Sequence, residues 1–532
     1  MNYNQLFKRI SSTSPVKFVS VVSSRSKFSH LVCFWQASDA WRAVLAFFMP
    51  FILYLYTLAP TIYNLDSAEL TTATVSGGLM RATGYPLYLI LGRLWAFLPL
   101  GDVGYRMNLF SAFNGALTVL FVERIMHRLK IGHWAALSSV GLLVTAPFFW
   151  SLSLVAEVYT LHTALMTLLI LLLMDWNEHP SHKKLGLITL IIGLSMGHHL
   201  ATALLVPGAV WYVLATHPRQ ALTPRGVFFA LAGLVLGLCV YLYLPLRYFT
   251  DPLFNYAGTY DANGQFHPVN LATPDGLWWL ITAKSFTEQM FAYEGVPLWN
   301  ETVWFIGHLA RAFFIIGLGP GLLGEAVFFR RNWKMAGMLF LMFACSAFFY
   351  IDYRVMDKET MFLPTYVIWA IWLGLGTQWL LDWLAASDAP VTKVWATRVL
   401  QSAMLISVFG AIFYTGPKVD LSDDWSTRIY SEAILENVEP GALIFGWWDT
   451  VPAIQYLQLV EGQRRDVQVV NRFLISFEDL TTYAKNEVSN RPVYINELPL
   501  SWHSIFDVKR AGPVFQLLPK DGEANVVQPQ GK

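Results

Sequence analysis

The sequence predicts an α-helical polytopic membrane protein with about eleven transmembrane helices and a small C-terminal α/β soluble domain. Hydrophobic residues make up 55% of the chain and charged residues only 14%, whereas soluble proteins carry about 25% charged residues. Apolar runs such as Ala135–Trp150 and Val227–Leu244 approach the length of about 20 residues that a membrane-spanning helix requires. The net charge of +1 says nothing about nucleic acid, but the lack of a basic patch interleaved with aromatic residues predicts no nucleic-acid partner.

The apolar runs place the helices along the chain, and the loops between them set the orientation. We expect helices over residues 43–60, 106–127, 134–150, 157–175, 185–198, 200–215, 226–246, 302–328, 335–351, 361–384 and 399–416. With the N-terminus in the cytoplasm, the inner segments hold eighteen lysines and arginines and the outer loops hold seven. Because cytoplasmic loops carry an excess of Lys and Arg, this count favours that orientation. An odd number of crossings then places the C-terminal region outside.

Four consecutive parts follow from this threading. We expect a basic cytoplasmic tail over 1–42, a transmembrane domain over 43–416, an extracytoplasmic α/β domain over 417–518 and a disordered tail over 519–532. The α/β domain is indicated by strand and helix patterns that alternate, as in a small βαβαβ fold. These patterns cover Ala442–Gly446, Val451–Glu461, Asp466–Asn471, Ser476–Asn486 and Pro492–Ile495.

Two long outer loops, 61–105 and 247–301, interrupt the predicted transmembrane domain. The first loop contains Ala68–Val75 and Leu87–Leu98, which are apolar but too short to span a membrane. We therefore expect both stretches to be helices that lie in the membrane interface. The second loop is rich in Asn, Gly, Pro and Trp.

Acidic residues near the outer helix ends are the first candidates for catalysis, because ionisable groups at membrane depth are costly. If a helix starts at Ser67, Asp66 is its N-cap and Glu69 its third residue, which has the form of a capping box. Gly77-Gly78 would end that helix. In the functional interpretation, Asp66 is a general base, and Glu69 positions the acceptor or assists. The two interpretations are compatible, because a capping residue is rigidly placed.

A second group of candidates lies at the outer ends of later helices. We expect Glu157, Tyr159, His198 and His199 to line a substrate pocket, although Glu157 could equally be structural. Adjacent side chains of a helix point in different directions, so one functional and one structural histidine are favoured over a metal-binding pair. No cofactor is otherwise expected. A divalent metal held by the outer-face carboxylates is a lesser alternative.

Three arginines are candidates for contacts with a lipid phosphate. Arg106 opens the second predicted helix, Arg247 ends the seventh, and Arg354 lies in a tight outer loop. A phosphate site requires such cations, because they neutralise the leaving group and its developing charge. The alternative is that each side chain snorkels to the interface, which suits Arg106 best.

Several short motifs follow one another in a specific order: Asp66-Ser67-Ala68-Glu69, Gly84-Tyr85-Pro86-Leu87-Tyr88, Arg106-Met107-Asn108-Leu109, Ala156-Glu157-Val158-Tyr159 and Gly197-His198-His199. In this order they resemble the domain-of-unknown-function family that includes the animal transmembrane protein O-mannosyltransferase, within the GT-C superfamily of glycosyltransferases. The resemblance is best over residues 43–250. It departs at Arg81-Ala82-Thr83, where members often carry His-Pro-Pro, and at Leu65, where a glycine is usual.

The resemblance implies a membrane glycosyltransferase that moves a sugar from a polyprenyl-phosphate donor to a hydroxyl acceptor, which is a protein, a lipid or a glycan. A carboxylate of the first outer loop would take the acceptor proton, and the phosphate would leave with the lipid. A transporter or flippase of a lipid-linked saccharide is the alternative, but transporters tend to have broken helices in repeated halves. A non-catalytic scaffold is a third interpretation. We expect the protein in the lipid bilayer of a bacterial inner (plasma) membrane.

Overall fold

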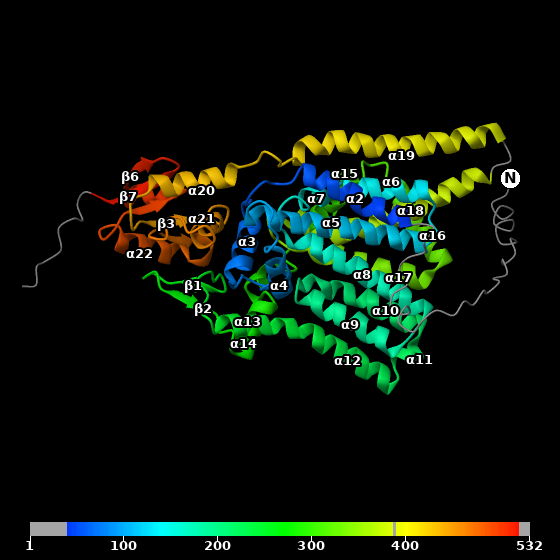
Figure 1. The fold of residues 1–532 in the computed structure, drawn as a ribbon, viewed down its shortest axis with the longest axis horizontal. Coiled ribbons are helices and arrows are strands. Elements are labelled where there is room, and N and C mark those ends of the chain that lie inside the picture. The colour runs from blue at the N-terminus through cyan, green and yellow to red at the C-terminus, as the bar shows by residue number, and fades with distance from the viewer. Residues whose placement is uncertain (1–39, 387–389, 521–532) are drawn as a thin grey trace, which may run out of the picture. The chain divides into compact units, whose positions relative to one another are not determined.

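The computed structural model describes residues 40–386 and 390–520, which form a bundle of helices followed by a region of mixed strands and helices (Figure 1). The expected N-terminal tail lies outside the described residues as far as residue 39. The last strand reaches Pro519, so the predicted boundary between the α/β domain and the C-terminal tail is wrong by at least one residue. Residues 521–532 of that tail lie outside the described part of the chain.

The bundle is built from α-helices (α) and 3₁₀ helices (η). Its first half contains α2 (Ala40–Tyr56), α3 (Asp66–Ser76), α4 (Pro86–Trp95), α5 (Val103–Arg128), α6 (His133–Val144), α7 (Pro147–Ser151), α8 (Val158–Glu178), α9 (His182–Met196), η2 (Leu200–Leu205), α10 (Val206–Thr216) and α11 (Pro218–Ala221). Its second half contains α12 (Pro224–Leu238), η3 (Cys239–Leu242), α13 (Tyr243–Tyr248), α14 (Pro274–Ile281), η4 (Lys284–Gln289), α15 (Gly295–Ala312), α16 (Leu318–Arg331), α17 (Trp333–Ile351), η5 (Lys358–Phe362), α18 (Leu363–Ala385) and α19 (Pro390–Val419).

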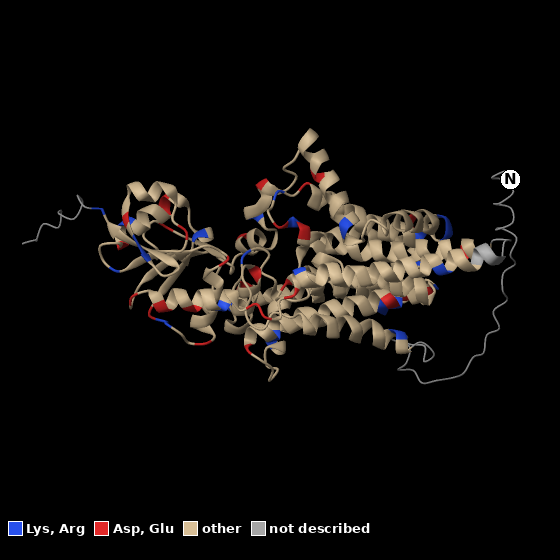
Figure 2. Cartoon of the chain, turned by 90° about the horizontal axis from the view of Figure 1, so that it is seen from above, with Lys and Arg blue, Asp and Glu red and all other residues tan. Residues whose placement is uncertain are grey.

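Six of the described helical segments are long and apolar enough to cross a membrane by length and composition. They are Val103–Arg128, Val158–Glu178, Pro224–Tyr248, Trp333–Ile351, Lys358–Ala385 and Val394–Val419. Three shorter apolar segments accompany them, Ala40–Tyr56, His133–Val144 and Leu200–Thr216. Charged side chains are sparse along these helices (Figure 2). The described residues therefore support a helical membrane protein, without reaching the eleven predicted spans.

Two of the predicted helices are broken in the structure. The range 302–328 was expected to be one helix, but α15 ends at Ala312 and α16 begins at Leu318. Phe314 and Ile315 between them both have positive φ, a conformation that no α-helix contains. The range 134–150 divides in the same way into α6 and α7, because Pro147 has no N–H to continue the ladder.

The first outer loop contains two short helices, as expected, but only α4 exposes apolar residues. α3 has 11 residues and α4 has 10, and a helix of that length spans only about half of a membrane. Leu94 of α4 and Phe97 just after it are exposed. In contrast, Leu70 and Ala73 of α3 are fully buried. The prediction that α3 lies in the membrane interface is therefore wrong, because protein covers this helix on all sides.

The second outer loop joins the first loop to the C-terminal region. It contains the hairpin of β1 (Gly258–Tyr260) and β2 (Phe266–Pro268). Isolated β-bridges pair Leu79 with Asn255 and Tyr260 with Ile475. The hydroxyl of Tyr256 donates to Oε1 of Gln455 at 2.6 Å. Three segments that are far apart in the sequence thus meet at one end of the bundle: the first outer loop, the second outer loop and the C-terminal region.

The C-terminal region contains the predicted βαβαβ series within a larger sheet. Its elements are α20 (Ser426–Asn437), β3 (Leu443–Gly446), α21 (Val451–Leu459), β4 (Gln468–Asn471), η6 (Arg472–Leu474), α22 (Phe477–Glu487), β5 (Val493–Ile495), η7 (Leu500–Ser504), β6 (Phe506–Ala511) and β7 (Val514–Pro519). The strand order is β4-β3-β5-β7-β6, with β4, β3 and β5 parallel and β7 and β6 antiparallel. The sequence analysis missed the β6–β7 hairpin, whose strands are only partly buried and lack long apolar runs.

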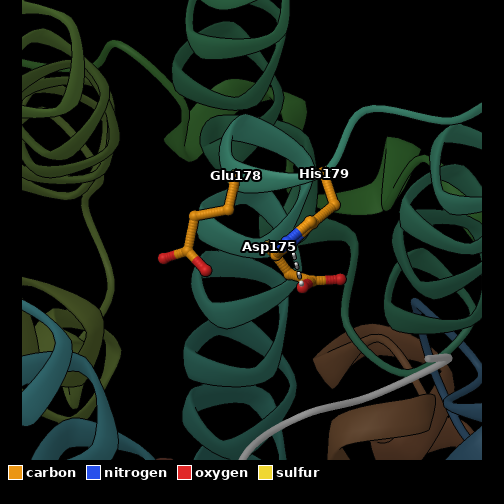
Figure 3. Close-up of side chains that lie close together, drawn as sticks. All are labelled: Asp175, Glu178 and His179. Atoms are coloured by element: carbon orange, nitrogen blue, oxygen red, sulfur yellow. Dashed lines mark ion pairs between the residues drawn. The ribbon is translucent and has the colours of Figure 1, made fainter. Parts of the chain in front are cut away.

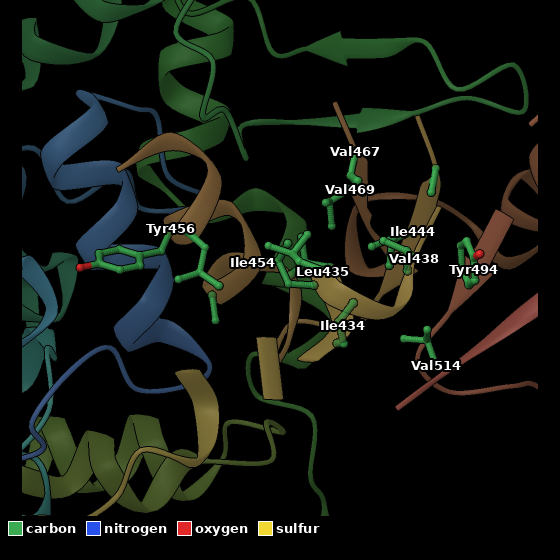
Figure 4. Close-up of a cluster of buried hydrophobic side chains, with 14 of the residues drawn as sticks. Ile434, Leu435, Val438, Ile444, Ile454, Tyr456, Val467, Val469, Tyr494 and Val514 are labelled. Atoms are coloured by element: carbon green, nitrogen blue, oxygen red, sulfur yellow. The ribbon is translucent and has the colours of Figure 1, made fainter. Parts of the chain in front are cut away.

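The C-terminal region packs against α3 through α21. One buried cluster joins Ile62 and Ala68 of the first outer loop to side chains of the α/β region (Figure 4). At its border, the backbone N–H of Gly104 donates to the hydroxyl of Tyr456 at 3.4 Å. Burial of apolar surface is the main stabilising term in such packing, so the α/β region and α3 fix each other's position.

A buried ion cluster joins α2 to α5. Nε of Arg42 lies 2.7 Å from Oε1 of Glu123, and Nε of Arg124 lies 2.6 Å from Oε2 of the same carboxylate. All three side chains are buried. The prediction that Arg42 belongs to a cytoplasmic tail is therefore wrong, because the residue lies inside α2 and faces the bundle.

We expect Glu123→Gln to destabilise the folded protein strongly, because it removes the carboxylate that pairs with the buried guanidinium of Arg42. Breaking a buried ion pair costs about 3–5 kcal/mol. The measurement is the midpoint of thermal unfolding of the purified protein in detergent. Glu178→Gln, which changes an exposed carboxylate of α8, is the control and should leave the midpoint unchanged. Equal midpoints for both variants would contradict a structural role for Glu123.

Candidate functional site

The acidic motif lies at the start of α3, although its geometry is not that of a capping box. Leu65, with φ of 53°, is the N-cap, and Asp66 is the first residue of the helix. No cap hydrogen bond comes from a side chain, so the predicted capping box is absent. The predicted end of the helix is confirmed, because Gly77 is left-handed and its N–H donates to the carbonyl of Ala73.

The carboxylate of Asp66 is held by donors from two distant parts of the chain. Nη2 of Arg81 donates to Oδ1 of Asp66 at 2.5 Å, and Nε1 of Trp448 donates to the same oxygen at 2.9 Å. The other oxygen, Oδ2, accepts no hydrogen bond from the described residues. About a quarter of the side chain is exposed. Asp66 is therefore a fixed carboxylate with one oxygen available to a ligand.

Glu69 lies one turn further along α3 and is fully buried. Its carboxylate accepts no hydrogen bond from the described residues, and Nε of Arg81 lies 3.5 Å from Oε2. Burial raises the pKa of Glu69 to about 8; the Arg81 charge opposes this rise and the Asp66 charge adds to it. Glu69 thus exchanges its proton near neutral pH, whereas a solvent-exposed glutamate is fully ionised there.

Arg81 is the centre of the site, and the sequence analysis did not select it. Burial alone would lower the pKa of the Arg81 guanidinium, but the charges of Asp66 and Glu69 raise it above its ordinary value. The guanidinium carbon also lies 3.9 Å from the ring centroid of Trp448. The signal that could have found it was the departure from the family motif, because Arg81 stands where members often carry histidine.

Glu157 is the N-cap of α8, and its charge interacts with that of Asp66. Its carboxylate accepts from the N–H of Val158 at 3.3 Å, and its own N–H donates to Oγ of Ser111 at 3.0 Å. Burial raises the pKa of the Glu157 carboxyl well above its usual range, and the negative charges of Asp66 and Asp357 raise it further. The N–H of Ala156 donates to Oγ of Ser67 at 3.2 Å, so the segments that carry Glu157 and Asp66 are in contact; that both side chains line one substrate pocket stays a prediction.

The two adjacent histidines have different environments. His198 is fully buried, and its Nε2 lies 2.7 Å from the carbonyl of Val158. Because a carbonyl only accepts, Nε2 carries the proton. Burial lowers the pKa of His198 to about 3, so the ring is neutral. His198 therefore supports the start of α8 rather than contacting solvent.

The ring of His199 lies beside the rings of two tyrosines. Its Nδ1 accepts from the N–H of Ala201 at 3.1 Å, which leaves the proton on Nε2 of the neutral ring. Its ring centroid lies 5.9 Å from those of Tyr85 and Tyr159. Of the two histidines, His199 is therefore the one placed beside Tyr159, as in the predicted pocket. Its contact with a substrate stays a prediction.

Two of the three candidate arginines support the backbone. The guanidinium of Arg106 donates to the carbonyls of Ala96, Leu100 and Gly101 at 2.8 to 3.0 Å. Nε of Arg247 donates at 2.6 Å to the carbonyl of Gly77, at the opposite end of α3 from Asp66, roughly 16 Å away for a helix of this length. Both arginines thus have structural partners outside the acid cluster.

Arg354 has a more accessible side chain. It is exposed, and its guanidinium makes no ion pair with any described residue, whereas its N–H donates to the carbonyl of Gln289. Nearby, Lys358 is buried and pairs with Glu301 at 2.6 Å. Of the three arginines predicted to contact a phosphate, Arg354 is therefore the one whose guanidinium N–H groups are available to a ligand.

One group of closely spaced ligand-type side chains outside the acid cluster at α3 is a candidate for a metal. Among the described residues, the group with suitably close ligand atoms is Asp175, Glu178 and His179 at the far end of α8 (Figure 3). Asp175 already pairs there with Nζ of Lys184 at 2.6 Å. Between Asp66 and Glu69, the guanidinium of Arg81 occupies the place of a cation.

Comparisons with known proteins confirm the resemblance that the motifs indicated. Residues 66–222 match the family described as the N-terminal domain of the protein O-mannosyl-transferase TMEM260. The chain is 22% identical over 478 residues to protein O-mannosyl-transferase tmem260 of Dictyostelium discoideum, covering 82% of this chain and 57% of that protein. It is 26% identical over 218 residues to TMEM260 of Mus musculus, covering 40% of this chain and 31% of that protein. The matches thus span less than two thirds of either relative.

Two crystal structures of ArnT from Cupriavidus metallidurans have a similar fold. The apo structure aligns with a TM-score of 0.59, covering 91% of this chain and 98% of that chain. The structure bound to undecaprenyl phosphate aligns with a TM-score of 0.54, covering 90% and 98%. Sequence identity is 14% in both, so the likeness is one of fold, and it supports the predicted GT-C-like architecture.

The raised pKa of Glu69 predicts a pH dependence of stability. In the unfolded chain this carboxyl ionises near pH 4.5, and in the folded protein near pH 8. The protonated carboxyl of Glu69 therefore makes its full contribution to the stability of the fold below about pH 4.5, and this contribution is lost as the pH rises through about 8. Glu69→Gln should remove this loss, so the variant gains unfolding temperature relative to wild type as the pH rises from about 4.5 to about 8. Glu436→Gln, at an exposed position, is the control. Parallel curves for Glu69→Gln and wild type would contradict the raised pKa.

Proposed function

We propose that this chain is a membrane glycosyltransferase that moves a sugar from a polyprenyl-phosphate donor to a hydroxyl acceptor at the outer face of the membrane. The relatives that match it are named protein O-mannosyl-transferases. The solved structures with a similar fold include one bound to undecaprenyl phosphate. These likenesses support the class of reaction, and the acid cluster supplies groups suited to it.

The proposed reaction forms one bond and breaks one. The acceptor oxygen attacks the anomeric carbon of the sugar, and the bond from that carbon to the phosphate oxygen breaks. The bonding electrons leave with the polyprenyl phosphate, and Oδ2 of Asp66 takes the proton of the acceptor hydroxyl. Removing that proton during the attack is general base catalysis. Arg354 is the proposed contact for the phosphate, because its guanidinium is exposed and unengaged within the described residues.

The observation that carries this proposal is the asymmetric binding of the Asp66 carboxylate. Two donors engage Oδ1, whereas Oδ2 is left for a ligand. A carboxylate that served only to cap α3 would accept hydrogen bonds from the first turn of the helix, and no side chain caps this turn. The excess of Lys and Arg in the predicted inner segments supports the proposal that this end of the bundle lies at the outer face.

A divalent metal is a separate question for this site. A cation bound jointly by Asp66 and Glu69 would have to displace Arg81, which lies within 3.5 Å of both carboxylates. We therefore propose that transfer proceeds with Arg81 in this place. Activity that persists in a chelator would agree with this proposal, and activity restored only by a divalent metal would overturn it.

Asp66→Asn should abolish sugar transfer and leave the protein folded. The amide keeps the shape of the carboxylate and can still accept from Trp448, but it cannot take a proton. Loss of a general base lowers the rate by about 10²–10⁴-fold. The assay is transfer from a synthetic polyprenyl-phosphate sugar in proteoliposomes, with the donor and the acceptor supplied on one face at a time.

Glu69→Gln is the matched control, because its carboxyl is buried and touches Arg81 rather than solvent. It should lose less activity than Asp66→Asn when the two are compared at equal amounts of folded protein. Near-normal transfer by Asp66→Asn, with a large loss in Glu69→Gln, would move the role of base to Glu69.

A further inference from the structure

Trp448 brings the C-terminal α/β region into the acid cluster. It lies between β3 and α21, and 9% of its surface is exposed. Its indole Nε1 donates to Oδ1 of Asp66 at 2.9 Å, and the face of its ring lies 3.9 Å from the guanidinium carbon of Arg81. One side chain therefore contacts both members of the Asp66–Arg81 ion pair.

The surroundings of Trp448 hold its ring in place. Its ring centroid lies 5.0 Å from that of Phe473 and 5.6 Å from that of Tyr256, both in tilted or edge-on arrangements. The helix α21, which follows Trp448 in the chain, packs against α3, and the hydroxyl of Thr72 donates to the carbonyl of Pro452 at 3.4 Å. The indole thus comes from a part of the chain whose position relative to α3 is fixed.

We propose that Trp448 is a positioning residue for sugar transfer, through which the C-terminal region completes the outer-face site. The inference rests on the proposed function and deepens it. The indole N–H fixes Oδ1, so that Oδ2 is directed toward the acceptor hydroxyl. The ring face holds the Arg81 guanidinium without engaging its N–H groups, which stay directed at the carboxylates.

The chemical consequence is that Trp448 fixes the orientation of the Asp66 carboxylate. Hydrogen bonds to charged groups are stronger than those between neutral partners. A tryptophan ring also attracts a cation on its face more strongly than the ring of phenylalanine does. Trp448→Phe removes the N–H and keeps a ring over Arg81, whereas Trp448→Leu removes both contacts.

The test compares kcat and KM for transfer in these variants of the full chain. We expect Trp448→Phe to lower kcat by about threefold to tenfold and to leave the KM for the donor near that of wild type, because the indole orients the base and does not bind the donor. Trp448→Leu should lower kcat further. Trp447→Phe is the matched control, because the neighbouring ring lies over Arg472, 4.5 Å from its guanidinium carbon, and does not contact Asp66. A wild-type kcat in Trp448→Phe would overturn the proposal.

A second readout does not depend on activity. A double-mutant cycle of Trp448→Phe and Asp66→Ala, measured by thermal unfolding in detergent, should be non-additive because the two residues share a contact. Additive effects would overturn the proposed contact even if transfer is observed. Non-additive effects in a protein that transfers no sugar in any assay would contradict the proposed function and leave the contact in place.

Discussion

The site depends on one cation between two carboxylates. Asp66 and Glu69 are three residues apart on α3, so they lie on the same face, and the negative charge of Asp66 adds to the burial that raises the pKa of Glu69. Arg81 contacts both carboxylates, and without it the fully buried Glu69 would have no charged partner among the described residues. The ion pair also fixes the loop after α3, because Arg81 follows the glycines that end the helix. The direction of the free oxygen of Asp66 follows from this geometry.

The rest of the outer end of the bundle holds α3 in a fixed position. At its C-terminal end, Arg93 donates to the carbonyl of Val75 at 2.8 Å, and Arg247 donates to that of Gly77. These two cations occupy the negative end of the helix dipole. On its flank, α21 buries Ala68 in the core of the α/β region. A short polar helix that would be unstable alone thus becomes the rigid support of the site.

The sequence predicted the features that arise from local patterns. Apolar runs indicated the long helices, and alternating strand and helix patterns indicated β3, β4 and β5. The order of short motifs identified the resemblance and the acids Asp66 and Glu157. The features that it missed depend on contacts between distant segments. Arg81 appeared to be an ordinary loop cation, and the contact between Trp448 and Asp66 joins residues 382 positions apart. Arg106 and Arg247 were chosen for their charge, but the carbonyls that they bind are visible only in the folded chain.

The central claim is that Asp66, held by Arg81 and Trp448, faces the reacting carbon of a lipid-linked sugar. A cryo-EM structure of the protein with a non-hydrolysable polyprenyl-phosphate sugar and an acceptor tests it most directly. The claim predicts the acceptor hydroxyl within hydrogen-bond reach of Oδ2 of Asp66, roughly 2.6–3.2 Å, with the anomeric carbon next to that hydroxyl. A donor bound elsewhere in the bundle, with its sugar away from α3, would contradict it.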